Sequence, residues 1–456
     1  MDPAESEAPG AATSGRLLNV LGLAFGLAGS VGGTIGAGIL RTPGLVAAQL
    51  PSGPWILLIW LLGGLYALLG ACCIAELAAA LPRAGGWYVY ANAAFGRRAG
   101  LVVGWCDWLA HCIGLAWVAT TLGDYLAPLC GLNPQFTAIG TLLLFSGIQL
   151  LGVRAGGTSQ ELLSLAKALA FIALVVGCFL LPQPIPMEGP KELIATDTSL
   201  VVPIVLALQG VISTFDGWAS PVYFAEEFEH PAQDLPRSLI GGVVTVLALY
   251  LLINGALLHV LPLGVLAQST LPAADAAALL LGRRGELVIT AIALVALLGL
   301  INTVVMAAPR ILYGLGRDGL LPAATAKVSP GGTPTTALLI TMATSVVLVL
   351  AGSFERLLGI GAFLYVLLPL SGLAALIQLR LNQPDLQRPF RCWGYPLTPL
   401  LVGLVSLGFL AGSLISDPGN SLLALGIAAT GGLATLISSS VVLLRPTEQE
   451  GINSKF

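Results

Sequence analysis

The sequence predicts an all-α polytopic membrane protein with twelve transmembrane helices. Of its 456 residues, 56% are hydrophobic and only 9% are charged, and the apolar residues fall into long runs. A soluble domain has about 25% charged residues, so this chain cannot solvate the surface of a soluble globule. The composition argues against a soluble enzyme, a nucleic-acid binder and a disordered scaffold, and the net charge of −3 creates no field for a polyanion.

Twelve apolar runs approach or exceed the roughly 20 residues that a helix needs to cross the hydrocarbon. Short segments rich in Pro, Gly and Asn separate them, and no gap would hold a soluble domain. The predicted spans are 17–40, 55–81, 99–128, 135–153, 160–182, 201–224, 239–262, 284–313, 335–351, 354–378, 397–415 and 421–443.

An even number of spans would place both termini on one side of the membrane. Fourteen of the 20 basic residues would lie on the side of the termini and five on the opposite side, leaving Lys167 inside a span. Because Lys and Arg accumulate on the cytoplasmic side, residues 1–16 and 444–456 are predicted to be cytoplasmic tails. Residues 1–16 have no basic n-region, so we expect no cleaved signal and an integral protein of the plasma (inner) membrane.

Two predicted spans contain helix-breaking residues. The first has GGTIGAGI at 32–39, and the sixth has STFDGW at 213–218, where Asp216 precedes Gly217. A glycine weakens a helix by about 1 kcal/mol, and a charge at membrane depth costs more. Irregular backbone is tolerated there only where it lines a cavity, so both helices are expected to open around one. The alternatives are close helix packing by small residues and a solvated helix end at Asp216.

The positions of the breaks, in the first and sixth spans, suggest an internal repeat. Residues 17–182 would form a first repeat of five spans and 201–378 a second, inverted because five is odd, while 397–443 would add two spans. Interrupted helices at equivalent positions of two repeats are the best sequence indication of a transporter site.

Five segments carry longer patterns, in order along the chain. They are GTIGAGILRTPGLVA at 33–47, AELAAALPRAGGWYVYANAAFG at 75–96, FDGWASPVYFAEEFEHPAQDLPRSL at 215–239, PRILYGLGRDGLLP at 309–322 and RPFRCWGYPLTPLL at 388–401. Together they resemble the signature stretches of the amino acid–polyamine–organocation (APC) superfamily of permeases, in its L-type and basic amino acid transporter branch. The resemblance implies a LeuT-type fold: ten helices in two inverted five-helix repeats, plus two peripheral helices.

The two breaks suggest how an amino acid would be held. Unpaired N–H groups that start the second half of the first helix favour a carboxylate, and carbonyls that end the first half of the sixth could accept from an ammonium. The resemblance implies the same assignment. The candidate substrate-binding residues are Thr34, Ile35, Gly36, Ala37, Gly38, Ser213, Phe215, Asp216 and Gly217.

The choice of substrate is less constrained by the sequence. No cation stands among the candidates to attract an acidic substrate, and Asp216 could favour a cationic one. Related permeases have an aromatic gate where alignment through Gly217 and Trp218 puts Ser213, and Phe215 could substitute for it. We expect a secondary active transporter of neutral or broad-range amino acids, either a permease or an exchanger. The alternatives are a polyamine or organic amine transporter, or an amino acid sensor.

Lys167 is expected about seven residues into the fifth span, roughly 10 Å deep at 1.5 Å per residue. A lone lysine at that depth is a functional hypothesis by default, with snorkelling near a helix end as the alternative. The stretch AKALA at 166–170 resembles one in the family. Its lysine is read as replacing the sodium ion that sodium-coupled members of the fold bind between the first, fifth and eighth helices. The resemblance implies no sodium requirement, and burial would make proton coupling at Lys167 possible.

Other polar residues have structural or gating interpretations. Asp107 and His111, four apart on the third span, would pair with each other or line the cavity. Glu226, Glu227 and Arg237 would form a cytoplasmic latch of ion pairs. Arg310 would end the eighth helix, where a cation favours the negative end of the dipole.

No protease or nucleotide-binding motif is found in the sequence, so we expect no enzymatic activity, cofactor, metal site or nucleic-acid partner. The expected partners are an amino acid substrate and the lipid bilayer. In heteromeric animal relatives, a cysteine between the third and fourth spans joins an ancillary glycoprotein. Cys130 falls in this loop, but the loop is short and its cysteine single, so such a subunit is not expected here.

Overall fold

The structure is a computed structural model that describes residues 16–36, 38–180, 201–351 and 353–442. Ala37 and almost all of both predicted tails lie outside these ranges. The first half contains α1 (Leu23–Thr34), α2 (Gly38–Ala47), α3 (Gly53–Ala80), α4 (Trp87–Phe95), α5 (Arg97–Cys130), α6 (Pro134–Leu150), α7 (Val153–Leu180) and α8 (Val201–Thr214). The second half contains η1 (Ser220–Glu227), α9 (Pro231–Val260), α10 (Leu263–Gln268), α11 (Pro272–Leu281), α12 (Arg283–Arg317), η2 (Ala323–Ala326), α13 (Thr335–Ala351), α14 (Phe354–Asn382), α15 (Leu397–Ser416) and α16 (Pro418–Val442).

Several of the described helices are long and apolar enough to cross a membrane. Seven described helices pass that test singly, and α1 with α2 passes it as a pair bent by 48°. The protein is therefore an all-helical, polytopic membrane protein. The other four predicted spans correspond to α6, to α8 with η1, to α13 and to α16, and the count of twelve stays a prediction. The seven single helices are α3, α5, α7, α9, α12, α14 and α15.

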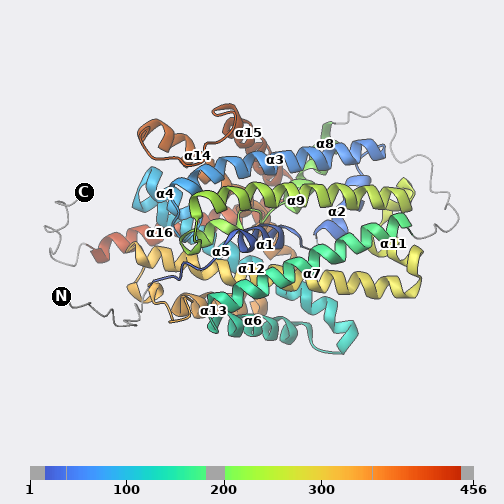
Figure 1. Ribbon diagram of the computed structural model, residues 1–456, viewed down its shortest axis with the longest axis horizontal. Helices are drawn as coiled ribbons and strands as arrows, with labels where there is room; N and C mark the ends of the chain where they lie inside the picture. The colour runs from blue at the N-terminus through green and yellow to red at the C-terminus, as the bar shows by residue number, and fades with distance from the viewer. Residues whose placement is uncertain (1–15, 37, 181–200, 352, 443–456) are drawn as a thin grey trace, which may run out of the picture.

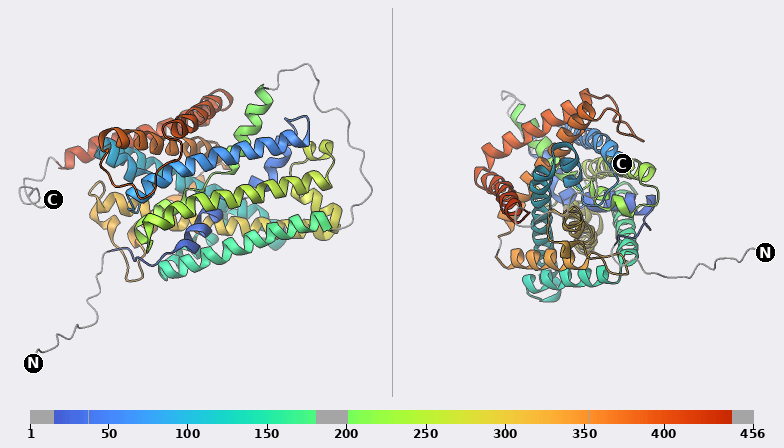
Figure 2. Two further views of the ribbon diagram at one scale, coloured as in Figure 1. Left: turned by 45° about the horizontal axis from the view of Figure 1, so that its top comes forward. Right: turned by 90° about the vertical axis from the view of Figure 1, so that its left-hand side faces the viewer.

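The long helices run along one axis of an elongated bundle. Helices α3, α9 and α7 lie side by side, and α4 lies at the opposite end of the bundle from α11 (Figure 1). The end-on view shows the remaining helices gathered around this axis (Figure 2). Helix α1 packs against α7, α9 and α12, so the first broken helix lies within the bundle.

The connections contain more helix than the sequence predicted. Helix α4 follows Gly85 and Gly86, whose φ angles of 126° and 74° favour glycine, and α10 and α11 occupy the predicted loop 263–283. Helix α9 begins at Pro231 instead of near 239. A proline suits the first helical turn, and Asp234 in that turn favours the positive end of the dipole.

Candidate functional site

Both predicted helix breaks are confirmed. Helix α1 ends at Thr34, Ile35 has an extended backbone (φ −76°, ψ 98°), and α2 begins at Gly38. Helix α8 ends at Thr214, and the chain turns through 215–219 before η1. The first helix is therefore interrupted at its glycines and the sixth at Asp216 and Gly217, as the sequence predicted.

The two breaks touch each other through their backbones. A Cβ atom added to Gly217 would lie 2.2 Å from the carbonyl oxygen of Gly33, and one added to Gly33 would lie 2.7 Å from that of Gly217. Gly217 also has a φ of 99°, which a side chain disfavours. Close packing is thus one role of these glycines, alongside opening the helices.

Substituting Gly217 by alanine should reduce transport strongly. The methyl group would collide with backbone that cannot rotate away, and the positive φ adds strain of about 1–3 kcal/mol. Uptake normalised to the amount of protein in the membrane measures the effect. The matched control is Gly29→Ala, because an added Cβ at Gly29 in α1 would meet no atom within 4 Å. Equal uptake by the two variants would contradict the prediction.

Hydrogen bonds fasten the broken helices to one another. The Tyr250 hydroxyl lies 3.2 Å from the carbonyl oxygen of Thr34 and 3.1 Å from that of Thr214, and it can donate to either. The Ser30 hydroxyl donates to the carbonyl of Trp218 at 3.1 Å. These bonds occupy carbonyls that the helix ends leave unpaired. Tyr250 in α9 was missed by the sequence analysis, because a tyrosine inside an apolar span carries no distinguishing pattern.

A cavity of about 400 Å³ opens beside the two breaks. Seven of the nine predicted binding residues line it: Thr34, Gly36, Gly38, Ser213, Phe215, Asp216 and Gly217. Ile35 is not among the lining residues and its side chain is fully buried in the core, while Ala37 lies outside the described residues.

Two further helices contribute side chains that were not predicted for the site: Tyr66 comes from α3 and Tyr365 from α14. His111 from α5 also lines the cavity, which was one of the two interpretations given to it. Phe215 packs against Trp60 and Tyr250, with ring centroids 6.2 and 5.0 Å apart, and is 1% exposed. Its ring is held by aromatic neighbours, whereas Ser213 is exposed.

Lys167 lies deeper than the sequence predicted. Helix α7 begins at Val153, not near 160, so Lys167 is about 21 Å along a helix that rises 1.5 Å per residue. Its ammonium donates to the carbonyls of Gly32 at 2.8 Å and Ile35 at 2.6 Å. The side chain is fully buried, so the snorkelling alternative is wrong.

The Lys167 ammonium lies where helices α1, α7 and α12 meet. Gly299 of α12 leaves room for it, because a Cβ there would be 3.1 Å from Nζ. The carbonyls at the end of α1 carry the negative end of the helix dipole, so a cation is favoured. The Lys167 ammonium thus stabilises the backbone carbonyls at the first break, and Lys167 is not one of the residues that line the cavity.

The sequence of this chain matches the family model of amino acid permeases over residues 17–437. The chain belongs to the amino acid permease family. The predicted resemblance is confirmed, and the permease is not an enzyme.

Individual relatives span most of the permease. The serine/threonine exchanger SteT of Bacillus subtilis is 29% identical over 87% of this chain and 91% of its own. The b(0,+)-type amino acid transporter 1 of Mus musculus is 28% identical over 87% of this chain and 83% of its own. The Asc-type amino acid transporter 1 of Homo sapiens is 29% identical over 90% of this chain and 80% of its own.

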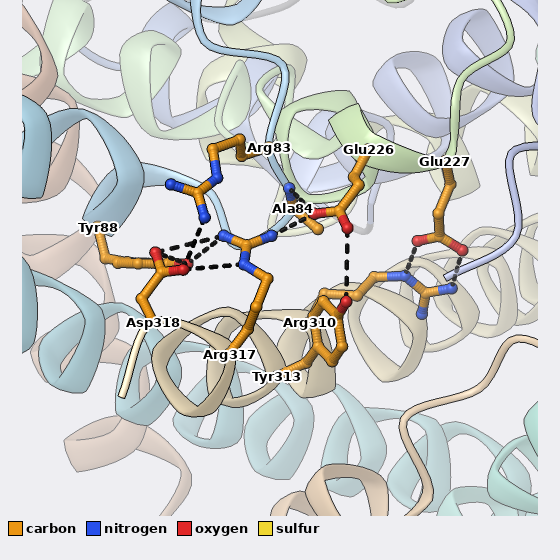
Figure 3. A network of polar contacts seen from close by, with 9 residues as sticks. All are labelled: Arg83, Ala84, Tyr88, Glu226, Glu227, Arg310, Tyr313, Arg317 and Asp318. Atoms are coloured by element: carbon orange, nitrogen blue, oxygen red, sulfur yellow. Dashed lines mark hydrogen bonds and ion pairs between the residues drawn. The ribbon is translucent and has the colours of Figure 1, made fainter. Parts of the chain in front are cut away.

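A network of ion pairs, here called the latch, joins η1 to α12 and to the segment after α3, as Figure 3 shows. Glu227 of η1 accepts two hydrogen bonds from Arg310 of α12, at 2.5 and 2.9 Å, and both side chains are at most 2% exposed. Glu226 pairs with Arg317 of α12. The second half of the sixth helix is thereby tied to α12.

The predicted composition of this latch was partly wrong. Arg237 is exposed and forms no ion pair within the described residues; Arg310 and Arg317 take that role. Arg310 does not end its helix, because α12 continues to Arg317. Partners this far apart in the sequence meet only when η1 and α12 pack together.

Asp318 extends the latch just beyond α12. Arg317 donates to its carboxylate at 3.0 Å, and Arg83, from the segment after α3, pairs with it at 2.7 Å. Burial alone would raise the pKa of Asp318, but the hydrogen bonds and charge of Arg317, the charge of Arg83 and the hydrogen bond from Tyr88 together outweigh burial and hold the pKa below its ordinary value. Asp318 therefore stays ionised at neutral pH, and the latch keeps its charge.

Cys130, the last residue of α5, is exposed and has a free thiol. A thiol in this position is accessible to a partner. The expectation that no ancillary glycoprotein binds therefore gains no support from the structure or from the relatives.

Proposed function

We propose that this permease is a secondary active carrier of neutral amino acids that works by alternating access and needs no sodium. The observation that carries the proposal is the meeting of two broken helices beside one cavity. Gly36 and Gly38 from the first break and Ser213 and Phe215 from the second all line this cavity. Half-helix N-termini favour a carboxylate, and half-helix C-termini favour an ammonium.

The lining of the cavity supports substrates with neutral side chains. No Lys or Arg is found among its described lining residues, so an acidic side chain would meet no permanent positive charge. The volume of about 400 Å³ accommodates an amino acid. A serine/threonine exchanger and an Asc-type amino acid transporter among the relatives agree with this range.

Lys167 supports the proposed independence of sodium. Its ammonium holds the carbonyls of Gly32 and Ile35, which are the hard oxygen ligands that a small cation would otherwise use. A bound sodium ion would have to displace a positive charge. Loss of the proton from Lys167 would release both carbonyls, and proton coupling at this residue is part of the proposal.

The proposed topology has twelve spans. Helices α6, α8 with η1, α13 and α16 would complete the set, with inverted repeats at 17–182 and 201–378. Residues 397–443 would supply the last two spans, and both termini would lie in the cytoplasm below the plasma (inner) membrane. The excess of basic residues on the side of the termini supports this orientation.

A competition assay tests the proposed substrate. Proteoliposomes that contain the purified permease are loaded with unlabelled serine, and the counterflow of labelled serine into them is measured. Each other amino acid and polyamines are then added outside as competitors. Serine counterflow that persists when choline replaces sodium supports the proposal. Absence of counterflow for every neutral amino acid would contradict it, and binding without counterflow would identify a sensor.

A cationic amino acid or polyamine is the second candidate, favoured by the carboxylate of Asp216 in the cavity lining. If cationic substrates use this carboxylate, Asp216→Asn should weaken their competition about tenfold or more relative to neutral amino acids. A hydrogen bond to a charged group contributes about 1.5–3 kcal/mol, which sets that scale. An unchanged ratio of cationic to neutral competition would reject the second candidate.

A further inference from the structure

A buried acid and a histidine lie next to each other on α5, beside the substrate cavity. His111 Nδ1 is 3.1 Å from Oδ1 of Asp107 and 2.8 Å from the backbone carbonyl oxygen of Asp107. Asp107 is fully buried, whereas His111 is 8% exposed and lines the cavity. A proton can therefore pass between the cavity and the buried carboxyl group through the imidazole ring.

The carboxyl group of Asp107 is only partly satisfied. Its Oδ1 accepts from the Tyr223 hydroxyl at 3.0 Å, while its Oδ2 has no hydrogen-bond partner in the part of the chain that is described. Each hydrogen-bond donor that reaches a buried carboxylate lowers the free energy of its ionised form. Without such donors, burying the negative charge costs free energy. Its ionised form is thus stabilised by His111, by the Tyr223 hydroxyl and by the backbone N–H of Trp87.

The tyrosine belongs to a different element from the acid. Tyr223 lies on η1, the second half of the broken sixth helix, and its ring packs edge-on to His111 at 4.8 Å. The other ionisable groups that face the pair are Tyr365 of α14, whose ring lies 6.5 Å from His111, and Asp216 in the break, which interacts with His111 electrostatically. If η1 moves, Tyr223 moves with it, and the hydrogen bond from the Tyr223 hydroxyl to Asp107 is lost.

We propose that Asp107 and His111 form a proton-binding site, separate from Lys167, whose occupancy follows the position of η1. The proposal rests on the alternating access proposed above. While Tyr223 donates to Asp107, the carboxylate can stay ionised beside a protonated His111. When η1 moves away, the carboxylate loses this donor and accepts the proton of His111, and His111 takes another proton from the cavity. Return of η1 releases one proton, so the cycle balances.

The test uses the full-length permease in proteoliposomes that enclose a pH-sensitive dye. Serine-induced proton movement and serine exchange are measured from pH 5 to 8 for wild type, Asp107→Asn and Tyr223→Phe. Asparagine can still accept from Tyr223 but cannot bind the proton. Asp107→Asn should therefore exchange serine with a smaller serine-induced proton movement than wild type, because only the coupling proposed for Lys167 remains. Asp124→Asn, an exposed position on the same helix, is the matched control and should behave as wild type.

Tyr223→Phe gives a second, independent readout. Removing the hydroxyl removes a donor that stabilises the ionised carboxylate. The midpoint of the pH profile should therefore move to higher pH by about one unit, which corresponds to 1.36 kcal/mol.

The outcomes separate this proposal from the proposed function. Proton movement and a pH profile that are unchanged in Asp107→Asn would overturn the proton site alone. A profile unmoved in Tyr223→Phe would overturn its link to η1, and this variant decides the question if Asp107→Asn fails to fold. Absence of serine exchange in wild type would contradict the proposed function instead.

Discussion

Lys167→Ala should lower amino acid uptake at least about 100-fold. Two charge-assisted hydrogen bonds would be lost, each contributing about 1.5–3 kcal/mol, and 1.36 kcal/mol corresponds to a factor of ten. The carbonyls of Gly32 and Ile35 would lose their hydrogen bonds from Lys167, and the first break would lose the positive charge of the ammonium. Uptake into proteoliposomes with equal amounts of reconstituted protein measures the effect.

Lys327→Ala is the control for Lys167, because Lys327 is exposed beyond α12 and should tolerate the same truncation. A second measurement compares uptake by the Lys167 variant with and without sodium. Partial rescue by sodium would support the substitution of lysine for a cation. Wild-type uptake by Lys167→Ala would show that the lysine has no part in transport.

The second large effect concerns the buried ion pair of Glu227 and Arg310. Glu227→Gln should destabilise the permease by about 3–5 kcal/mol, because it leaves Arg310 as an uncompensated buried charge. Arg310 also stacks on the Phe224 ring at 4.6 Å, so it cannot withdraw to water without losing packing. Thermal unfolding of the detergent-solubilised protein, followed by the loss of monodisperse material, measures the effect.

Two comparisons distinguish the ion pair from a general effect of charge removal. Arg237→Ala removes an exposed arginine that forms no ion pair among the described residues, and it should change stability by less than about 1 kcal/mol. The double variant Glu227→Met with Arg310→Met should recover part of the loss, because no buried charge then lacks a partner. Equal stability of Glu227→Gln and wild type would contradict the assigned role of the pair.

The candidate site was predicted unevenly from the sequence. The breaks at 32–39 and 213–218 were found because glycine and a charge are unusual inside apolar spans, and Lys167 was found for the same reason. Tyr66 and Tyr365 were missed, because aromatic residues in membrane helices are unremarkable until a helix places them against a cavity. The buried side chain of Ile35 could not be foreseen, since its position in the break does not determine which way its side chain points.

Sequence alone determined the class of the protein and the places where its helices open. Those properties follow from composition and local backbone preference, which need no knowledge of neighbours. Only the tertiary structure decided which groups meet: Gly33 with Gly217, Lys167 with the end of α1, and Glu227 with Arg310. Such contacts join residues far apart in the chain, so they exist only once the helices pack. The cavity between the two breaks is a product of that packing.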